Sequence, residues 1–522
     1  MRTRESSSQG GREWLPRDTT KPTKDSLAGD LPPEVLGMVV WYLSDEDKRS
    51  FSSVCRYFRD LTIPVLFSHL TVRFGSWTPG PPKPYINLEG PLPHYTLKDQ
   101  HAELARINMD TCGMLRHMHN NPSFARVVKK LTIYAYYIPG RSCADELLNL
   151  KQAIQAMPNI TSFRWEGRCP LPGAAVLAAL ANSSGHVLRE LYLPSSDDTR
   201  ACLTNFKQLH TIVLRSPHDV DNELCRADDS QVCVCAGVEA NQETLVRLTL
   251  HGTAILRCPV RSLLGLQELE MFLPHSMVGL EPIFDHCINL RYVTLDFHAD
   301  ECPQFLELLT RKPGAWPQLT GFKLFYDSFW YLRMLKHAQL AVLVNFLKGK
   351  KKLRMLDLAN VDLEEGTPSP LLEELRDFTA LKVLGLNMRR FRFTLEDISA
   401  LCTRQFSALL IKQVVDWDIY RWNEMFARLT SVRYLHIIDT GITVDFRRWL
   451  LKRPNSLELV GSNTELCWLK HDSERDVPYY LPPWPPSKAT FATTDDFGCK
   501  DWEWLFRYHA RRSFDKPASM LG

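Results

Sequence analysis

A short apolar pattern recurs along most of this chain and constrains its fold more than any other feature. The pattern is apolar-x-x-apolar-x-apolar, as in Leu188-x-x-Leu191-x-Leu193. The spacing of two between its last apolar residues is typical of a short strand, in which alternate side chains point to the same face. Twelve copies occur in series, with the central residues Leu131, Phe163, Leu191, Ile212, Leu248, Leu269, Val293, Phe322, Leu356, Leu384, Leu409 and Leu435.

The distances between successive copies indicate what these strands build. The central residues are 32, 28, 21, 36, 21, 24, 29, 34, 28, 25 and 26 positions apart. The series resembles the leucine-rich repeat, whose period is roughly 20–29 residues with one strand in each repeat. Several steps are longer, and the usual asparagine after the strand is mostly missing, which indicates irregular repeats with full helices. An ordinary α/β domain with scattered matches is the alternative, which a series of this length disfavours.

Helical spacing of apolar residues occurs between the strands. Leu147, Leu150, Ile154 and Met157 share one face, and Pro158 stops the run before the next strand. Residues 305–309 and 340–347 have the same spacing. Each strand is too short to be stable alone, so we expect parallel strands to stack into one continuous core. The prediction is an irregular solenoid over residues 98–465, with parallel strands on the concave side and helices on the convex side.

The remaining parts of the chain differ in composition. We predict a disordered polar tail at 1–28, a compact apolar block at 29–74, a Pro/Gly-rich connection at 75–97, and an aromatic and Pro-rich cap or tail at 466–522. An exposed terminal strand needs a cover. The aromatic residues predicted to cap the last repeat are Trp484, Trp502, Trp504 and Phe506.

Net charge and targeting signals exclude several classes of protein. The formal charge of +3 over 522 residues creates no strong field for nucleic acid or an anionic membrane. The first residues contain no apolar signal region, and no apolar run is long enough to span a bilayer. We therefore expect a cytoplasmic or nuclear protein, or one found in both, whose fourteen cysteines are mostly reduced.

No catalytic motif is present in the sequence. The patterns G-x-S-x-G, H-E-x-x-H and G-x4-G-K-[ST] are absent, and His117, His119 and His286 have no recurring partner. The remaining alternative is a catalytic site formed by residues that are far apart in the sequence and meet only in the fold. We therefore expect no enzyme and no cofactor.

The long step at residues 213–244 contains acidic residues and several cysteines. Cys225, Cys233 and Cys235 suggest a zinc site, but their spacing of C-x7-C-x-C lacks the paired C-x2-C of structural zinc sites. Buried thiols are the favoured interpretation, and no metal is predicted. An enzyme or ligand binder that uses this insertion remains a minor alternative.

The apolar block at 29–74 has the features of three short helices. Pro32 and Pro33 suit the first turn of a helix, and Ser44 or Asp45 suits the cap of a second. A third helix is predicted at 53–61, ending before Pro64. The block is near the lower size limit for independent folding, and its first helix is apolar around much of its circumference. We therefore expect this helix to be buried on two sides, one of them against a partner.

The same block resembles the F-box family. The resemblance rests on Leu31-Pro-x-Glu-Val35, Leu43-Ser-x-x-Asp47 and Val54-Cys-Arg-x-Phe58, in the order and spacing of the family motif. Lys48 departs from it, because the family usually has leucine after the second-helix aspartate. The layout looks like that of fungal F-box proteins with irregular leucine-rich repeats. The full fold class is then α/β, with a three-helix F-box followed by the solenoid.

This resemblance implies a substrate-receptor subunit of an SCF-type (Skp–cullin–F-box) E3 ubiquitin ligase. Its partners would be a Skp-type adaptor, through it a cullin, and a client protein bound by the repeats. The alternative is a leucine-rich-repeat interaction scaffold with no ubiquitin ligase link, in which the block merely caps the solenoid. The residues implied to bind the adaptor are Leu31, Pro32, Val35, Leu36, Leu43, Phe51, Val54, Cys55 and Phe58.

A client would meet the side chains that lie between the core positions of each strand, because these point to the concave face. The set mixes tyrosine with both signs of charge, which suits a protein surface better than a phosphate backbone. The predicted client-binding residues are Tyr192, Arg247, Glu268, Glu270, Tyr292, Lys323, Asp357, Tyr434 and His436.

Overall fold

The computed structural model describes residues 31–75, 97–136, 143–215, 228–272, 277–298, 302–327, 335–361, 375, 377–387, 405–412, 430–438, 456–463, 465–472 and 477–509. The chain divides into two compact units, which we name the helical unit (Met1–Ser68) and the repeat unit (His69–Gly522). The predicted tail at 1–28 and residues 76–96 of the predicted connection lie outside the described residues.

The described part of the helical unit consists of α1 (Pro33–Tyr42), α2 (Asp45–Val54) and α3 (Arg56–Leu66). Pro33 lies in the first turn of α1, where its missing N–H leaves no helical bond unmade. Ser44 caps α2, because its Oγ accepts a hydrogen bond from the Asp47 amide at 3.1 Å. The rings of Phe51 and Phe58 stack with centroids 4.1 Å apart and pack α2 against α3.

The third helix differs from the predicted range of 53–61. α2 extends to Val54, Cys55 is extended with φ −157° and ψ 170°, and α3 begins at Arg56. α3 also continues past the predicted stop at Pro64 as far as Leu66. Pro64 is exposed, and Leu66 beyond it is half-buried. The partial burial of this last turn offsets the loss of the helical hydrogen bond that proline cannot donate.

The repeat unit is built on one open sheet whose strands follow one another in chain order. Strands β1 to β14 are parallel, and β15 and β16 extend the sheet antiparallel. The described strands are β1 (His69–Gly75), β2 (Lys130–Tyr136), β3 (Ser162–Cys169), β4 (Glu190–Pro194), β5 (Thr211–Arg215), β6 (Arg247–His251), β7 (Glu268–Phe272), β8 (Tyr292–His298), β9 (Gly321–Asp327), β10 (Met355–Asn360), β11 (Val383–Asn387), β12 (Ala408–Lys412), β13 (Tyr434–Ile438), β14 (Leu459–Ser462), β15 (Glu465–Asp472) and β16 (Val477–Tyr480).

The register of the sheet aligns the central residue of each predicted repeat with that of the next. Leu131 pairs with Phe163, Phe163 pairs with Leu191, and the series continues without a break to Leu435. All twelve central residues are buried. The predicted strands are therefore β2 to β13, and the predicted fold class, a solenoid with one continuous core, is confirmed.

Two further strands extend the ladder beyond the predicted repeats. Leu70 in β1 pairs with Leu131, and Val460 in β14 pairs with Leu435. Phe67-x-x-Leu70-x-Val72 fits the apolar pattern, but it lies in the block predicted to be helical. At β14 a serine occupies the last apolar position of the pattern, so the sequence did not reveal a further repeat there. The antiparallel β15 then covers the last parallel strand.

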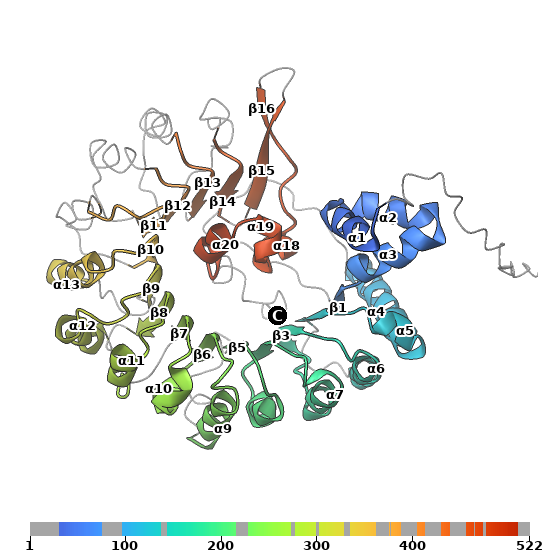
Figure 1. Cartoon of the computed structure of the whole chain (residues 1–522), viewed down its shortest axis with the longest axis horizontal. Helices are drawn as coiled ribbons and strands as arrows, with labels where there is room; N and C mark the ends of the chain where they lie inside the picture. The colour runs from blue at the N-terminus through green and yellow to red at the C-terminus, as the bar shows by residue number, and fades with distance from the viewer. Residues whose placement is uncertain are drawn as a thin grey trace, which may run out of the picture. The chain divides into compact units, whose positions relative to one another are not determined.

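Helices connect the strands along the outer side of their arc (Figure 1). The segments predicted at 147–157, 305–309 and 340–347 fall on α6, α12 and α13. Leu150 and Ile154 of α6 are fully buried in the core beneath the sheet. The described elements of this layer are α4 (Leu97–Asn120), α5 (Pro122–Ala125), α6 (Ala144–Gln155), α7 (Ala174–Ser184), α8 (Asp197–Ala201), η2 (Cys202–Asn205), α9 (Asp228–Glu239), α10 (Ala254–Arg257), η4 (Val260–Leu263), α11 (Glu281–His286), α12 (Cys302–Arg311) and α13 (His337–Lys348).

One buried asparagine joins two neighbouring repeats. The Asn241 side chain accepts a hydrogen bond from the Leu209 amide at 2.8 Å and donates to the carbonyls of Phe206 at 3.0 Å and Gly237 at 2.8 Å. It therefore satisfies backbone groups before β5 and at the end of α9 that water does not reach.

We predict that Asn241→Ala lowers the free energy of unfolding by about 2–4 kcal/mol, because it leaves buried backbone groups without partners. The matched control is Asn289→Ala, since the Asn289 side chain makes a similar bond to the Leu264 carbonyl at 3.1 Å but is exposed. The control should cost less than about 1 kcal/mol in the same urea titration. Equal costs for the two variants would contradict the role given to Asn241.

Candidate interaction surfaces

The concave face of the sheet is covered by residues 484–509, which we name the C-terminal segment. Its helices α18 (Pro486–Thr490), α19 (Thr494–Phe497) and α20 (Lys500–Phe506) lie inside the arc of strands (Figure 1). α20 contacts β10, β11 and β12. Concave side chains of β10 to β15 form a second apolar core with seven residues of the segment: Trp484, Ala489, Phe497, Trp502, Trp504, Leu505 and Phe506.

These aromatic residues were predicted to cap the last repeat, but most of them pack against strands inside the sheet. Trp504 lies beside Gly321 of β9, and Leu505 lies beside Gly385 of β11, both well inside the ladder. Trp484 is near the end, with its ring centroid 6.1 Å from that of Trp468 in β15. The segment therefore fills the concave face, and β15 covers the terminal strand.

Two concave glycines allow this close approach. A Cβ at Gly385 would lie 2.3 Å from Asp357 Oδ1 and 3.3 Å from Leu505 Cδ1. At Gly321 it would lie 2.8 Å from the Tyr292 ring and 3.3 Å from the Trp504 ring. The strands are therefore shaped to receive the segment.

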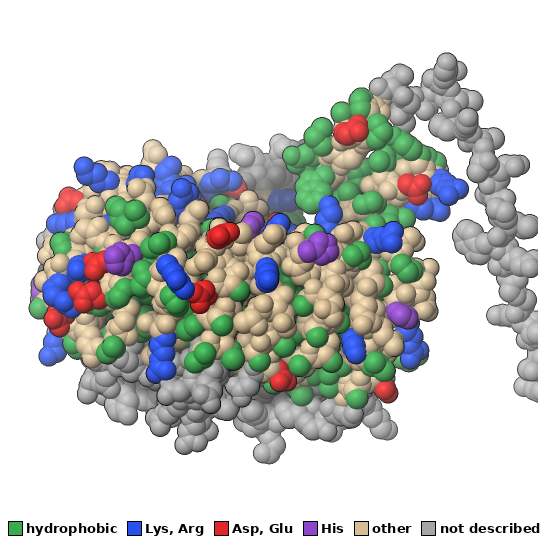
Figure 2. Space-filling model, turned by 60° about the horizontal axis from the view of Figure 1, so that its bottom comes forward, with side chains coloured by type: hydrophobic (Ala, Val, Ile, Leu, Met, Phe, Trp, Pro, Cys, Tyr) green, Lys and Arg blue, Asp and Glu red, His purple; other side chains and the backbone are tan. Residues whose placement is uncertain are grey.

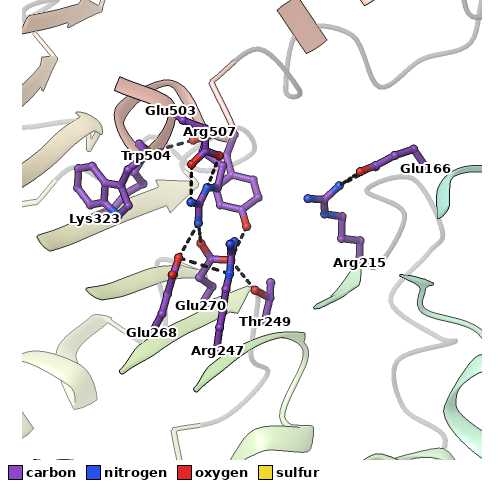
Figure 3. Close-up of polar contacts among 11 residues, drawn as sticks. Glu166, Arg215, Arg247, Thr249, Glu268, Glu270, Lys323, Glu503, Trp504 and Arg507 are labelled. Atoms are coloured by element: carbon purple, nitrogen blue, oxygen red, sulfur yellow. Dashed lines mark hydrogen bonds and ion pairs between the residues drawn. The ribbon is translucent and has the colours of Figure 1, made fainter. Parts of the chain in front are cut away.

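Arg507 is the centre of a buried charge network on this face (Figure 3). Its Nη1 lies 2.6 Å from Glu268 Oε1 and 2.7 Å from Glu270 Oε1. Its Nε and Nη2 bond to the two carboxylate oxygens of Glu503 at 2.8 and 2.6 Å. Arg247 Nη2 approaches Glu270 Oε2 at 3.1 Å. Two guanidinium groups thus neutralise two carboxylates from strand β7 and one from helix α20, as burial of charge requires.

The same arginines control the ionisation of Glu270. Burial by itself raises the pKa of Glu270, but Arg247 and Arg507 outweigh burial and hold this pKa well below its ordinary value. The hydroxyl groups of Thr249 and Tyr508 also donate to Glu270 Oε2, at 2.5 and 2.6 Å. Glu270 is therefore a fixed anion.

Lys323 holds the carboxyl end of α20. Its Nζ donates to the carbonyl oxygens of Trp504, Leu505 and Arg507 at 2.7, 3.0 and 3.1 Å. A cation suits this position, because the last carbonyls of a helix lack partners and carry partial negative charge. The Lys323 Nζ also lies 2.9 Å from Asp357 Oδ2, which His509 Nε2 contacts at 2.8 Å.

The predicted client-binding residues do project from the concave side of their strands, but they do not form an open surface. Tyr192, Glu268, Glu270, Lys323, Asp357, Tyr434 and His436 are buried, and Arg247 and Tyr292 are half-buried. Their interpretation as solvent-facing side chains is therefore corrected, because the C-terminal segment bonds to or packs on most of them. Their role in binding a client stays a prediction.

A signal for this covering was present in the sequence. The concave positions of β11 and β12 include Gly385 and Ala408, which are small enough to allow a second layer to approach. The C-terminal segment supplies the complementary tryptophan and phenylalanine residues. The spacing of residues in the sequence does not reveal that the strands and this segment meet. Arg507, for example, bonds to Glu268 and Glu270, which precede it by 239 and 237 positions.

Several large apolar side chains of the helical unit are exposed, and Figure 2 shows hydrophobic side chains over its helices. Met38, Trp41 and Tyr42 of α1 are 58%, 65% and 87% exposed. They are spaced i, i+3 and i+4, so they share one face of the helix. Leu36 and Val40 lie on another face and are buried. α1 thus has two apolar faces, of which one remains open.

The predicted adaptor-binding residues divide between surface and interior. Leu31, Pro32, Val54 and Cys55 are exposed, and Val35, Leu43, Phe51 and Phe58 are half-buried. Leu36 is only 6% exposed and packs inside the unit, and its role in binding an adaptor stays a prediction. Met38 and Trp41 belong to the apolar circumference predicted for the first helix, but Met38, Trp41 and Tyr42 are not among the residues that the family resemblance implies.

The predicted insertion at 213–244 is described only in part. Cys225 and its acidic neighbours lie outside the described residues, whereas Cys233 and Cys235 lie on α9. Across the described ranges, no group of three or more His, Cys, Asp or Glu side chains is arranged to hold a metal ion. Nor does any helix among those ranges combine the length and apolarity needed to span a bilayer.

Comparisons with known proteins add little. No family model and no curated protein matches the sequence. A protein of known structure from Bacteroides fragilis is similar with a TM-score of 0.27 and 11% identity, over 50% of this chain and 66% of that one. The yeast complex of Rad7 and Elc1 contains a chain similar with a TM-score of 0.33 and 14% identity, over 59% of this chain and 84% of that one. Both TM-scores are below 0.5, so neither similarity indicates a function for this chain.

The described elements define the class of protein by themselves. One short strand in each repeat, a parallel ladder in chain order and helices along the outer side are the features of a leucine-rich-repeat-type solenoid. A three-helix unit precedes the solenoid in the chain.

We predict that Arg507→Met lowers the free energy of unfolding by about 3–5 kcal/mol, because it leaves buried carboxylates without their partner. The matched control is Arg311→Met, whose exposed pair with Glu281 at 3.2 Å should contribute less than about 1 kcal/mol. Urea denaturation followed by tryptophan fluorescence measures both. Equal losses would show that the network contributes no more than a surface ion pair.

Stability should also depend on pH through His436. Its Nε2 donates to the Asn463 carbonyl and its Nδ1 accepts from the Tyr434 hydroxyl. Burial lowers the pKa of His436 from 6.5 to about 3. Between pH 6.5 and pH 3 the His436 side chain is therefore protonated in the unfolded chain but stays neutral in the folded chain. The free energy of unfolding falls as pH falls through this range. The depressed pKa values of Glu270 and Asp357 act in the same direction below their ordinary values.

His436→Gln should accordingly show a smaller loss of stability between pH 7 and pH 5 than wild type. His337→Gln is the control, because His337 is exposed, and it should retain the wild-type dependence. Urea titrations at the two pH values test this. A His436→Gln profile that matches wild type would contradict the prediction.

Proposed function

We propose that this protein is the non-catalytic substrate-receptor subunit of a Skp–cullin–F-box ubiquitin ligase, of the fungal type with leucine-rich repeats. In this proposal the helical unit binds a Skp-type adaptor, and through it a cullin, while the repeat unit binds a client. The observation that carries the proposal is the open apolar face of α1, formed by Met38, Trp41 and Tyr42.

Physical chemistry supports a protein partner for this face. Single exposed apolar side chains are common on soluble proteins, but a contiguous group that includes tryptophan and tyrosine is typical of an interface. The same unit contains the segment from Leu31 to Phe58 that resembles the F-box motif. Two independent features of one short segment therefore favour adaptor binding over a simple cap for the solenoid.

The proposal also places the client surface outside the concave area that the C-terminal segment covers. Displacing the segment would expose Trp502, Trp504, Leu505 and Phe506, at about 1.5–3 kcal/mol for each side chain. That cost is comparable with the whole binding free energy of a nanomolar complex, about 12 kcal/mol. A client that binds the remaining faces of the repeats avoids this cost.

In this proposal the chain carries no catalytic site and no cofactor of its own. Transfer of ubiquitin is performed by other subunits, and the receptor supplies proximity between client and ligase. The protein acts in the cytoplasm, the nucleus or both, where a Skp-type adaptor is present.

Co-purification with a fungal Skp-type adaptor tests the proposal on the full chain. Wild type should retain the adaptor, and Met38→Glu with Trp41→Glu should weaken binding at least about thirtyfold, the effect of losing a hot spot worth 2 kcal/mol. These positions are better than Leu36, because a charge at a buried position would disturb the unit itself.

Ile288→Glu is the control, because Ile288 is 55% exposed in the repeat unit and should bind the adaptor like wild type. If wild type fails to retain the adaptor, the ligase assignment is wrong and the scaffold alternative is favoured. If the double variant binds as wild type does, the α1 face is not the docking surface.

A further inference from the structure

Two cysteines from adjacent repeats meet on the outer side of the solenoid. Cys235 lies on α9, and Cys258 directly follows α10. Their Sγ atoms are 3.4 Å apart, with the Cys258 thiol donating to the Cys235 sulfur. Both sulfur atoms also lie near the carbonyl oxygen of Ala254, at 3.6 and 3.5 Å. The sequence separates the two by 23 positions, so only the fold brings them together.

The two thiols have unequal reactivity. The hydrogen bond from Cys258 lowers the pKa of Cys235, and the neighbouring Arg257 acts in the same direction. Cys235 is also half-buried, whereas Cys258 is buried and its pKa is raised by the same hydrogen bond. Cys235 is therefore the more accessible of the two sulfur atoms and the one that more readily forms a thiolate.

Two other buried cysteines differ in reactivity from this pair. Cys287 and Cys302 are buried, and burial raises the pKa of each to about 12. Thiols in that state react slowly with oxidants. The contrast distinguishes Cys235 on α9 and Cys258 after α10 from these two buried thiols.

We propose that Cys235 and Cys258 form an intramolecular disulfide when the protein meets hydrogen peroxide. The Cys235 thiolate attacks one peroxide oxygen, the O–O bond breaks, and the departing hydroxide takes a proton to become water. Cys258 then attacks the sulfur of the resulting sulfenic acid, the S–O bond breaks, and the Cys258 proton leaves with the hydroxide as a second water. Two thiols lose two electrons to one peroxide, and the sulfur atoms approach to about 2.05 Å.

The disulfide would close a loop that contains the whole of β6. On the concave side of that strand, Arg247 and Thr249 hold Glu270, and Glu270 binds Arg507. The crosslink would therefore stiffen the repeat that anchors the C-terminal segment. A crosslink raises stability by limiting the unfolded chain, so oxidation should raise the midpoint of thermal unfolding by several degrees.

The experiment treats the reduced full-length protein with one equivalent of hydrogen peroxide, alkylates the remaining thiols and maps peptides by mass. The expected result is a mass loss of about 2 Da, one crosslinked peptide that joins Cys235 to Cys258, and reversal by dithiothreitol, as a reversible disulfide requires. Alkylation of both cysteines after treatment, or a crosslink to a different cysteine, would overturn the proposal.

Two variants sharpen the test. Cys258→Ser should abolish the crosslink and leave a sulfenic acid at Cys235 that dimedone traps, while Cys233→Ser should crosslink as wild type does. Cys233 is the matched control, because it lies two residues before Cys235 on the same helix. If dimedone labels Cys233 and not Cys235, the assigned nucleophile is wrong. If Cys258→Ser folds poorly by circular dichroism, Cys235→Ser replaces it and should lose both the crosslink and the label.

Discussion

Every other feature of the repeat unit depends on the stacking of short parallel strands in one register. The shortest, β14, has 4 residues and the longest parallel strand, β3, has 8, so none can bury its apolar side chains alone. The pairing that sets Leu248 beside Leu269 also sets Arg247 beside Glu268 and Thr249 beside Glu270. The apolar core on one face of the sheet therefore determines which polar side chains meet on the other.

The concave polar network and the second apolar core have different physical roles. Burial of Trp502, Trp504 and Phe506 supplies the free energy that holds the C-terminal segment in place. Ion pairs such as Arg507 with Glu268 add less net stability, because the cost of desolvation offsets their attraction. They do fix the position of the segment on the sheet, because any other position would leave these charges buried without partners. Lys323 adds a second fixed point at the end of α20. Together these contacts make the concave face an interior rather than an open surface.

The two units thus present unlike surfaces to other molecules. The repeat unit uses the apolar positions of its strands within itself, on both faces of the sheet. In the helical unit, α1 buries Leu36 and Val40 but leaves Met38, Trp41 and Tyr42 open. The exposed apolar side chains of α1 lie in the segment whose sequence resembles the F-box motif, which is why the proposed adaptor contact rests on this unit. The thiol pair on the outer side of β6 is a separate feature, linked to the concave network through that strand alone.

The sequence by itself determined the class of fold, the positions of twelve strands, several outer helices and the start of the first two N-terminal helices. These features follow from apolar spacing and capping residues, which act over a few positions. Only the tertiary structure decided that the chain returns to cover Lys323 and Asp357, that Leu36 faces inward while Trp41 faces outward, and that Cys235 meets Cys258. Contacts between residues as far apart as Glu268 and Arg507 leave no trace in local periodicity, because they depend on where the folded backbone brings distant side chains together.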